Sequence, residues 1–205
     1  METNINQPEF VGFPKIARLS REIIITEKID GTSAQVLIGA DGSMSFGSRT
    51  RWLSIGNDNF GFAAWCESHR DELSKLGVGR HYGEWWGSGI QRGYGLKEKR
   101  FSLFNTARWH LAGAQPHVVS TPNPHEVIMS TELPACVHLV PVLYQGMFTT
   151  DAVDSALNDL RQLGSCAASG FMNPEGVVVF HTASRTMFKK TLEHDESPKG
   201  KVPNA

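Results

Sequence analysis

Turn sequences divide much of this chain into short, strand-like segments, and this pattern constrains the fold more than any other feature. The clearest turn is Ala40-Asp41-Gly42, because Asp-Gly is a strong signal for a tight turn between two strands. It predicts a hairpin with strands over 34–39 and 43–48. Further strands are expected over residues 21–27, 79–86, 101–105, 137–145, 175–181 and 185–192.

Two segments instead show the three- and four-residue spacing of apolar side chains that is typical of amphipathic helices. The spacing predicts helices over 58–76 and 150–163, which end before Gly77 and Gly164. Many short strands with only two helices favour an antiparallel α+β domain over a doubly wound parallel sheet. Residues 106–135 lack periodicity and are expected to form a long loop that holds at most short elements.

The chain has 205 residues, of which 40% are hydrophobic and 20% charged, and this suits one folded core. We expect a single domain over residues 1–205, with a core over about 15–194 and a flexible tail over 195–205. No segment is apolar over the length needed to cross a bilayer, and the N-terminus lacks the order of a signal peptide. A cytoplasmic location without membrane contact is therefore expected.

Charge and cysteine content exclude further classes. The net charge of −1 gives no global signature of nucleic-acid binding, although a local groove can still carry the contacts. The three cysteines are too few and too widely spaced for a disulfide framework. Cys136 and His138, with His117 and His125 upstream, could bind a metal, but core or loop positions explain these residues more simply.

Lys28 lies between an apolar run, Ile23-Ile24-Ile25, and the turn at Asp30-Gly31. A lysine at a strand end is well placed to act as a covalent nucleophile, because glycine lets the backbone approach a ligand closely. Taken alone, the segment Glu27–Thr32 is better explained as an ordinary turn, because an acidic residue and a glycine after a strand usually form no more than a turn.

Five further segments follow Lys28 and decide between these readings. They are Phe46-Gly47-Ser48-Arg49, Tyr82-Gly83-Glu84-Trp85-Trp86-Gly87, Phe101-Ser102-Leu103-Phe104-Asn105, Pro174-Glu175-Gly176-Val177-Val178-Val179-Phe180 and Met187-Phe188-Lys189-Lys190-Thr191. In this order, over residues 23–192, they resemble the motifs of the covalent nucleotidyltransferases, which comprise ATP-dependent DNA and RNA ligases and the mRNA capping enzymes. Thr32-Ser33 after the glycine and the run over 83–91 are more similar to RNA ligases, particularly small members encoded by bacterial viruses.

The resemblance implies an α+β, antiparallel-sheet nucleotidyltransferase (ligase adenylation) domain with ATP-grasp-like architecture and no OB-fold appendage. It also implies ATP and Mg²⁺ (or Mn²⁺) as cofactors. A lysine would attack the α-phosphate of ATP to give lysyl-AMP, AMP would pass to a 5′-phosphate end, and a 3′-hydroxyl would displace it. Each step displaces a group at phosphorus, so positioning and charge neutralisation should carry most of the catalysis.

By this resemblance Lys28, Arg49 and Lys189 are the candidate catalytic residues. Lys28 matches the nucleophile, which must attack as a neutral amine, and nearby cations such as Mg²⁺, Lys189 and Arg49 favour that form. Arg49 matches the arginine that contacts the ribose or the incoming phosphate, where a planar guanidinium suits pairs of oxygens. Lys189 matches a lysine that binds phosphate.

The same resemblance implies the remaining ATP-binding residues. Glu84 matches the glutamate that accepts hydrogen bonds from the ribose hydroxyls, and Phe104 matches the aromatic that stacks on adenine. Glu175 matches the carboxylate that holds Mg²⁺ directly or through waters. Glu27 and Ile29 flank Lys28 and are expected to contact the nucleotide, Glu27 through its position rather than its side chain.

Nucleic-acid ends, RNA in particular, are the implied partner of a monomeric protein. A local basic groove is expected to bind them, formed by Arg51, Arg92, Lys97, Lys99 and Arg100. The segment 91–100 could also be a solvated loop, because its composition alone does not distinguish the two.

The chain departs from the family pattern on its last strand. Many relatives carry lysine-x-lysine there, which points two cations inward because side chains alternate along a strand. Here Lys189 and Lys190 are adjacent, so a regular strand would point only one of them inward, and Phe180 stands where several relatives keep a cation. We therefore expect fewer cations in the pocket.

Three other functions stay open from the sequence. The first is a DNA-nick or broad polynucleotide ligase, and the second is a nucleotide-binding module that does not turn over. The third, a GTP-using capping enzyme, is disfavoured by Thr32-Ser33.

Overall fold

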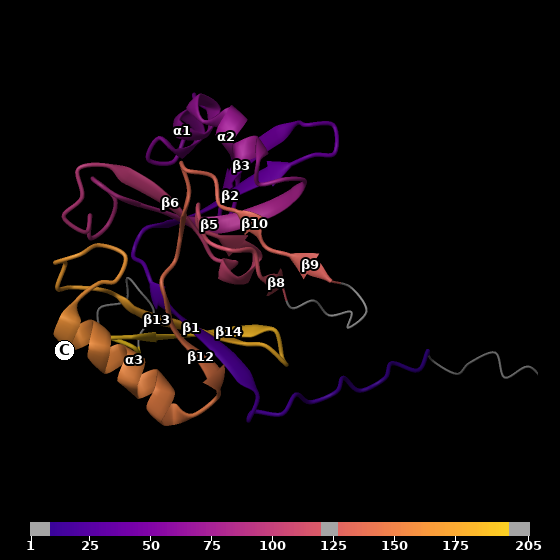
Figure 1. Cartoon of the computed structure of the whole chain (residues 1–205), viewed down its shortest axis with the longest axis vertical. Coiled ribbons are helices and arrows are strands. Elements are labelled where there is room, and N and C mark those ends of the chain that lie inside the picture. The colour runs from indigo at the N-terminus through magenta and orange to yellow at the C-terminus, as the bar shows by residue number, and fades with distance from the viewer. Residues whose placement is uncertain (1–8, 120–126, 197–205) are drawn as a thin grey trace, which may run out of the picture.

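The computed structural model describes residues 9–119 and 127–196. These residues form two lobes, each built around one sheet, and Figure 1 shows the larger sheet with α1 and α2 above the smaller sheet with α3. Residues 9–20 precede the first strand as an extended, exposed segment. The prediction of an α+β domain with mostly antiparallel sheets is confirmed.

The smaller sheet has four antiparallel strands in the order β12-β1-β13-β14. Their bounds are Val142–Met147 for β12, Glu22–Lys28 for β1, Gly176–His181 for β13 and Thr186–Thr191 for β14. Helix α3, Thr150–Leu163, packs on one face of this sheet, where alternate residues of β1 and β13 join its apolar side in a buried cluster. The opposite face of the sheet is thereby left for the cleft between the lobes.

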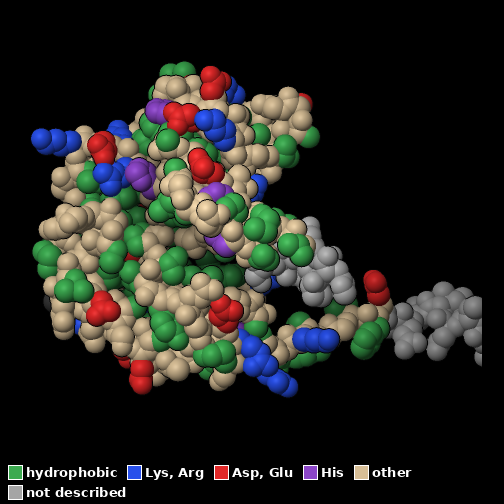
Figure 2. All heavy atoms as spheres, viewed as in Figure 1, with side chains coloured by type: hydrophobic (Ala, Val, Ile, Leu, Met, Phe, Trp, Pro, Cys, Tyr) green, Lys and Arg blue, Asp and Glu red, His purple; other side chains and the backbone are tan. Residues whose placement is uncertain are grey.

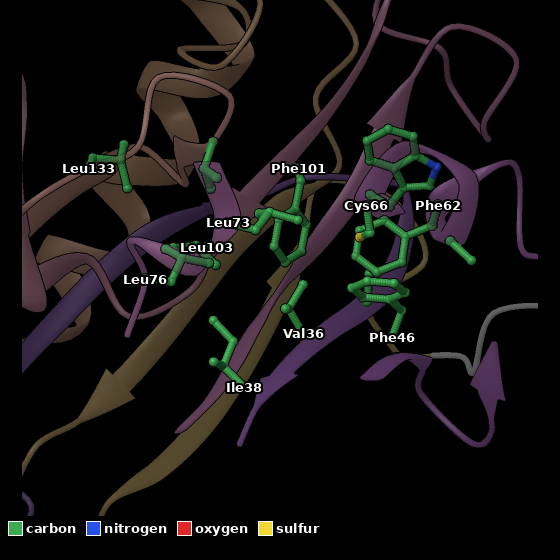
Figure 3. Close-up of a cluster of buried hydrophobic side chains, with 14 of the residues drawn as sticks. Val36, Ile38, Phe46, Phe62, Cys66, Leu73, Leu76, Phe101, Leu103 and Leu133 are labelled. Carbon is green, nitrogen blue, oxygen red and sulfur yellow. The ribbon is translucent and has the colours of Figure 1, made fainter. Parts of the chain in front are cut away.

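The larger sheet has six strands in the order β11-β6-β5-β2-β3-β4. The bounds are His138–Leu139 for β11, Lys99–Leu103 for β6, Gly79–Gly87 for β5, Thr32–Ile38 for β2, Met44–Ser48 for β3 and Trp52–Leu53 for β4. Helices α1, Phe62–Ser68, and α2, Arg70–Ser74, cover one face. Figure 3 shows the apolar side chains of this cluster, with Phe62 and Cys66 of α1 turned toward the strands that carry Val36, Phe46 and Phe101.

A third buried cluster joins the two lobes. It contains Ile29, Trp86, Tyr94, Val140 and Ala168, which come from both lobes and from the connections between them. The chain passes from the small sheet to the large one just after β1 and returns between β11 and β12. Lys28, the last residue of β1, therefore lies at the joint between the sheets.

Residues 104–135 hold only short elements among the described positions. They are a 3₁₀ turn at Thr106–Arg108, β7 at Trp109–His110, β8 at Val118–Val119, β9 at Ile128–Met129 and β10 at Thr131–Glu132. These strands pair as β10 with β7 and β8 with β9, in two small sheets. No described helix is long and apolar enough to span a membrane.

Two predicted elements differ from the structure. The helix expected over 58–76 begins only at Phe62, after Gly61 in a left-handed conformation, and is interrupted at His69, whose backbone is not helical. The strand expected over 137–145 is wrong as one element, because β11 and β12 belong to different sheets with Pro141 between them. Proline has no backbone N–H for a strand ladder, so the chain changes sheets there. Of the expected flexible tail, residues 197–205 lie outside the described residues.

Candidate active site

Lys28 and Glu175 form an ion pair at the joint between the lobes. Lys28 ends β1, Glu175 directly precedes β13, and the two strands pair so that Lys28 lies opposite Gly176. The lysine Nζ lies 2.6 Å from Oε2 of Glu175, and the two side chains are 24% and 9% exposed. Along β1 the side chains of Ile23 and Ile25 pack toward α3, so Lys28, at the alternate position, points to the other face of the sheet.

Glu84 approaches the same place from the larger sheet. It lies opposite Ser33 in the pairing of β5 with β2, and its Oε1 accepts a hydrogen bond from the backbone N–H of Gly31 at 3.1 Å. The pKa of Glu84 is raised to about 7, chiefly by burial and also by the charges of Glu175 and Asp30, while Lys28 and the Gly31 N–H lower it in part. Lys28, Glu84 and Glu175 thus form one electrostatically coupled group.

Glu27 has a buried side chain that points away from this group. Its carboxylate accepts hydrogen bonds from Ser165 Oγ at 2.6 Å and from the backbone N–H groups of Cys166 at 2.8 Å and Ala167 at 3.0 Å. Burial raises the pKa of Glu27, and these hydrogen bonds offset the rise only in part. The side chain therefore anchors the loop after α3 to β1. Contact between the Glu27 position and the nucleotide stays a prediction.

The two lysines of the last strand lie on opposite faces of the small sheet. Lys190 Nζ donates to Asp154 Oδ1 of α3 at 2.7 Å, so this side chain lies on the helix side. Lys189 and Met187 are at the alternate positions and share the other face. Lys189 is therefore the lysine of β14 on the side away from α3, and Met187 and Thr191, which share that side, carry no charge. That Lys189 binds phosphate stays a prediction.

A cleft of about 450 Å³ lies between the lobes. Figure 2 shows the surface hollowed between them. Its walls include two predicted residues, Arg49 after β3 and Phe104 after β6, and Phe104 is 42% exposed. Met187 of β14 contributes from the small sheet, and Ser33, the pairing partner of Glu84, contributes from β2. The predicted residues Lys28, Glu84, Glu175 and Lys189 are not among the residues that line this cleft.

Sequence reasoning missed several cleft residues. Arg80, Tyr82 and Arg108 line the same cleft. Tyr82 could have been found from β5, because it lies two residues from Glu84 and therefore on the same face. Another hollow, of about 550 Å³ between β3, β4 and α1, contains none of the predicted site residues.

Four of the five predicted basic residues, all except Lys97, donate hydrogen bonds to other described groups of the chain. Arg92 pairs with Asp30, Lys99 Nζ donates to the Phe60 carbonyl at 2.8 Å, and Arg100 pairs with Glu98. Arg51 donates to the Asn57 and Asp58 carbonyls. The basic groove therefore stays a prediction, and Arg92 in particular is held inside the joint.

No group of three or more His, Cys, Asp or Glu side chains that could hold a metal ion occurs in the ranges 9–119 and 127–196, so the alternative at Cys136 and His138 finds no support there. His125 lies outside the described residues. Glu175 offers a hard oxygen ligand beside Lys28, which fits Mg²⁺, since this ion is usually held by one or two carboxylates together with substrate phosphates.

The two sheets, the cleft between them and the lysine at their joint form a ligase-type nucleotidyltransferase fold. A family model described as RNA ligase matches residues 21–191, and the chain belongs to this family. A comparison with curated proteins found no match.

Similar solved structures come from an RNA ligase of Naegleria gruberi. A lysine-to-alanine mutant with ATP and Mn matches with a TM-score of 0.53 and 18% identity, over 84% of this chain and 49% of that one. A glutamate-to-alanine mutant with AMP and Mn matches with a TM-score of 0.52 and 18% identity, over 90% of this chain and 57% of that one. At this identity the likeness shows the fold, and this chain spans about half the length of these structures.

Proposed function

We propose that the chain is an ATP-dependent RNA ligase that forms lysyl-AMP on Lys28, transfers AMP to a 5′-phosphate end and seals that end to a 3′-hydroxyl. The observation that carries this proposal is the position of Lys28 at the joint, where it pairs with Glu175 at 2.6 Å and acts on the pKa of Glu84. Ser33, the pairing partner of Glu84, lines the cleft that also contains Phe104. Membership of the RNA ligase family supports it, as do the ATP and AMP in the matched structures.

In the first step the neutral amine of Lys28 attacks the α-phosphorus of ATP. The Nζ–P bond forms, the bond from that phosphorus to the bridging oxygen breaks, pyrophosphate leaves, and Nζ loses a proton. Lys189 and Arg49 are proposed to neutralise charge on the phosphates, because Arg49 lines the cleft and Lys189 shares a face of β14 with Met187, which also lines it. Glu175 would hold Mg²⁺ or Mn²⁺, which supplies further charge neutralisation at the phosphates when bound.

The nucleoside would occupy the cleft. Phe104 exposes 42% of its surface there and can stack on adenine, while Glu84 can accept hydrogen bonds from ribose hydroxyls. Ile29 and Glu27 support the nucleotide indirectly, since both are buried and fix the backbone on either side of Lys28.

Labelling with α-labelled ATP and Mg²⁺ tests the first step. The wild-type protein should acquire a stable AMP adduct, Lys28→Ala should acquire none, and Lys75→Ala, at an exposed site after α2, should label normally. A wild-type protein that never labels under these conditions contradicts the proposal.

The later steps are tested separately, because the chain spans about half the length of the matched structures. Sealing of nicked RNA, nicked DNA and single strands should favour RNA. Preference for nicked DNA would support a DNA-nick or broad polynucleotide ligase instead. In these assays Arg51, Lys97 and Arg100 are the proposed contacts to the nucleic acid, and their replacement should weaken sealing more than adduct formation.

A nucleotide-binding module without turnover is the second candidate. The specific observation in its favour is Met187, which shares a face of β14 with Lys189, lines the cleft and brings no charge to it. Tight ATP binding without an adduct would support this candidate.

A further inference from the structure

Arg92 connects the two backbone segments that carry Lys28 and Glu175. Its Nε donates to Oδ2 of Asp30, two residues after Lys28, at 3.1 Å. Its Nη1 donates to the carbonyl of Asn173 at 2.9 Å, to Oδ1 of Asn173 at 2.7 Å and to the carbonyl of Pro174, next to Glu175, at 3.2 Å. One guanidinium therefore binds the chain segment next to Lys28 and also the segment next to Glu175.

The loop between β5 and β6 is shaped to present this guanidinium. Gln91 and Tyr94, on either side of Arg92 and Gly93, have φ values of 46° and 53°, a left-handed conformation that costs free energy in residues other than glycine. Tyr94 contacts the same two segments as Arg92. Its hydroxyl accepts from the Asp30 N–H at 2.8 Å, and its ring lies 4.5 Å from that of Phe171.

The contacts depend on the geometry of arginine rather than on its charge alone. Asp30 is 6% exposed and Arg92 is 23% exposed, so the pair is largely shielded from water. The planar guanidinium carries five donors in a fixed fork and can bind acceptors on both sides at once, whereas a lysine ammonium is a compact charge without that fork. A lysine at this position would keep the charge but could not reach both segments in the same way.

We propose that Arg92 is a positioning residue for lysyl-AMP formation, which fixes the spacing between Lys28 and Glu175 by joining the Asp30 segment to the Asn173–Pro174 segment. This inference rests on the proposed function. It replaces the role of Arg92 as a contact to nucleic acid, and the two roles differ in a measurable way. A positioning residue acts on the first step without nucleic acid, while a nucleic-acid contact acts only when ends are present.

Single-turnover formation of lysyl-AMP without nucleic acid provides the test, with Arg92→Lys as the main variant. We expect the maximal rate to fall about 10–100-fold, because small misplacements of reacting groups cost rate on this scale. The KM for ATP should change less than about three-fold, since Arg92 acts on the spacing of reacting groups and not on nucleotide binding. Arg70→Lys, which alters an exposed arginine–carboxylate pair on the outer helices, is the matched control and should leave both values unchanged.

A milder variant separates positioning from loss of folding. Asn173→Ala removes one acceptor of Arg92 at an exposed position and should lower the maximal rate a few-fold without lowering the melting temperature. Combining Asp30→Asn with Arg92→Lys should cost less than the product of the two single effects, because both changes break the same contact.

Two results would overturn the proposal. One is an Arg92→Lys protein that forms lysyl-AMP at the wild-type maximal rate, and the other is an effect confined to the KM for ATP or to sealing. If the wild-type protein forms no adduct, the proposed function fails. The positioning role is then tested separately by amide hydrogen exchange without ATP, which measures how firmly the two segments are held. Arg92→Lys should speed exchange in both segments, 28–31 and 173–176, and unchanged exchange would refute it.

Discussion

Nζ of Lys28 lies 2.6 Å from Oε2 of Glu175, so the proposed nucleophile is engaged in an ion pair in this structure. An ion pair uses the ammonium form of lysine, whereas attack on phosphorus requires the neutral amine. The pair must therefore separate before the first step, and a divalent cation at Glu175 would promote that separation by taking over its carboxylate.

Replacing Glu175 should consequently slow adduct formation, even though Lys28 is then released. We expect Glu175→Gln to lower the single-turnover rate by about 10²–10³-fold and to raise the Mg²⁺ concentration needed for half-maximal rate, since the amide is a weaker ligand for a hard cation. Asp154→Asn is the matched control, because it alters the other lysine–carboxylate pair, on the helix side of the small sheet. A Glu175→Gln protein with wild-type rate and Mg²⁺ dependence would contradict the assigned role.

The two adjacent lysines of β14 should differ sharply in their effects. Lys189→Ala is expected to slow adduct formation about 100-fold, because it removes charge from the cleft side of the strand. Lys190→Ala only breaks an exposed pair with Asp154, so the rate should be retained and stability should change by about 0–1 kcal/mol. Rapid-quench labelling and thermal unfolding of both variants measure this contrast, and equal rates would show that the strand faces are misassigned.

Local signals in the sequence were sufficient for most of the elements. The Asp41-Gly42 turn placed the hairpin, and the periodicity over 150–163 placed α3 with the bounds Thr150–Leu163. The strand at 137–145 failed because both halves look alike in composition, and only the pairing of β11 with β6 and of β12 with β1 separates them. Such pairing is decided by tertiary contacts, which local propensity does not contain.

The sequence predicted those site residues that belong to motifs occurring in the same order as in the ligase family. Lys28 and Glu175, which are 147 positions apart in sequence, do meet in the structure. Arg92 was assigned to nucleic acid because a cation in a loop looks the same from sequence whether it is solvated or bound to a carboxylate. Its partners, Asp30 and Asn173, lie 62 and 81 residues away, so no local pattern could indicate the contact.

The half-buried carboxylate of Glu84 should make stability depend on pH. Burial raises its pKa from 4.5 to about 7, so between these values the unfolded state releases this proton while the folded state retains it. The free energy of unfolding should therefore fall as pH rises through this window. Glu84→Gln keeps an oxygen that can accept from Gly31, removes the titration and should be more stable than wild type above about pH 7.

Melting temperatures across the pH range test this expectation. Each kcal/mol of penalty removed should raise the melting temperature by about 2–4 °C in a chain of this size. Glu132→Gln, at an exposed position of β10, is the control and should follow the wild-type curve. Parallel curves for wild type and Glu84→Gln would show that Glu84 does not titrate in this window.

Two phenylalanines three residues apart should separate nucleotide binding from packing. Phe104 is 42% exposed in the cleft, whereas Phe101 is fully buried and lies 5.1 Å, ring to ring, from Phe62. Phe104→Ala should raise the KM for ATP about 10-fold through lost stacking, with stability changed by less than about 0.5 kcal/mol. Phe101→Ala should instead lower the free energy of unfolding by about 3–5 kcal/mol, because it leaves a cavity in the larger core. An unchanged KM for ATP in Phe104→Ala would show that Phe104 does not stack on adenine. Because the side chain is 42% exposed, its replacement should not disturb the fold enough to obscure this result.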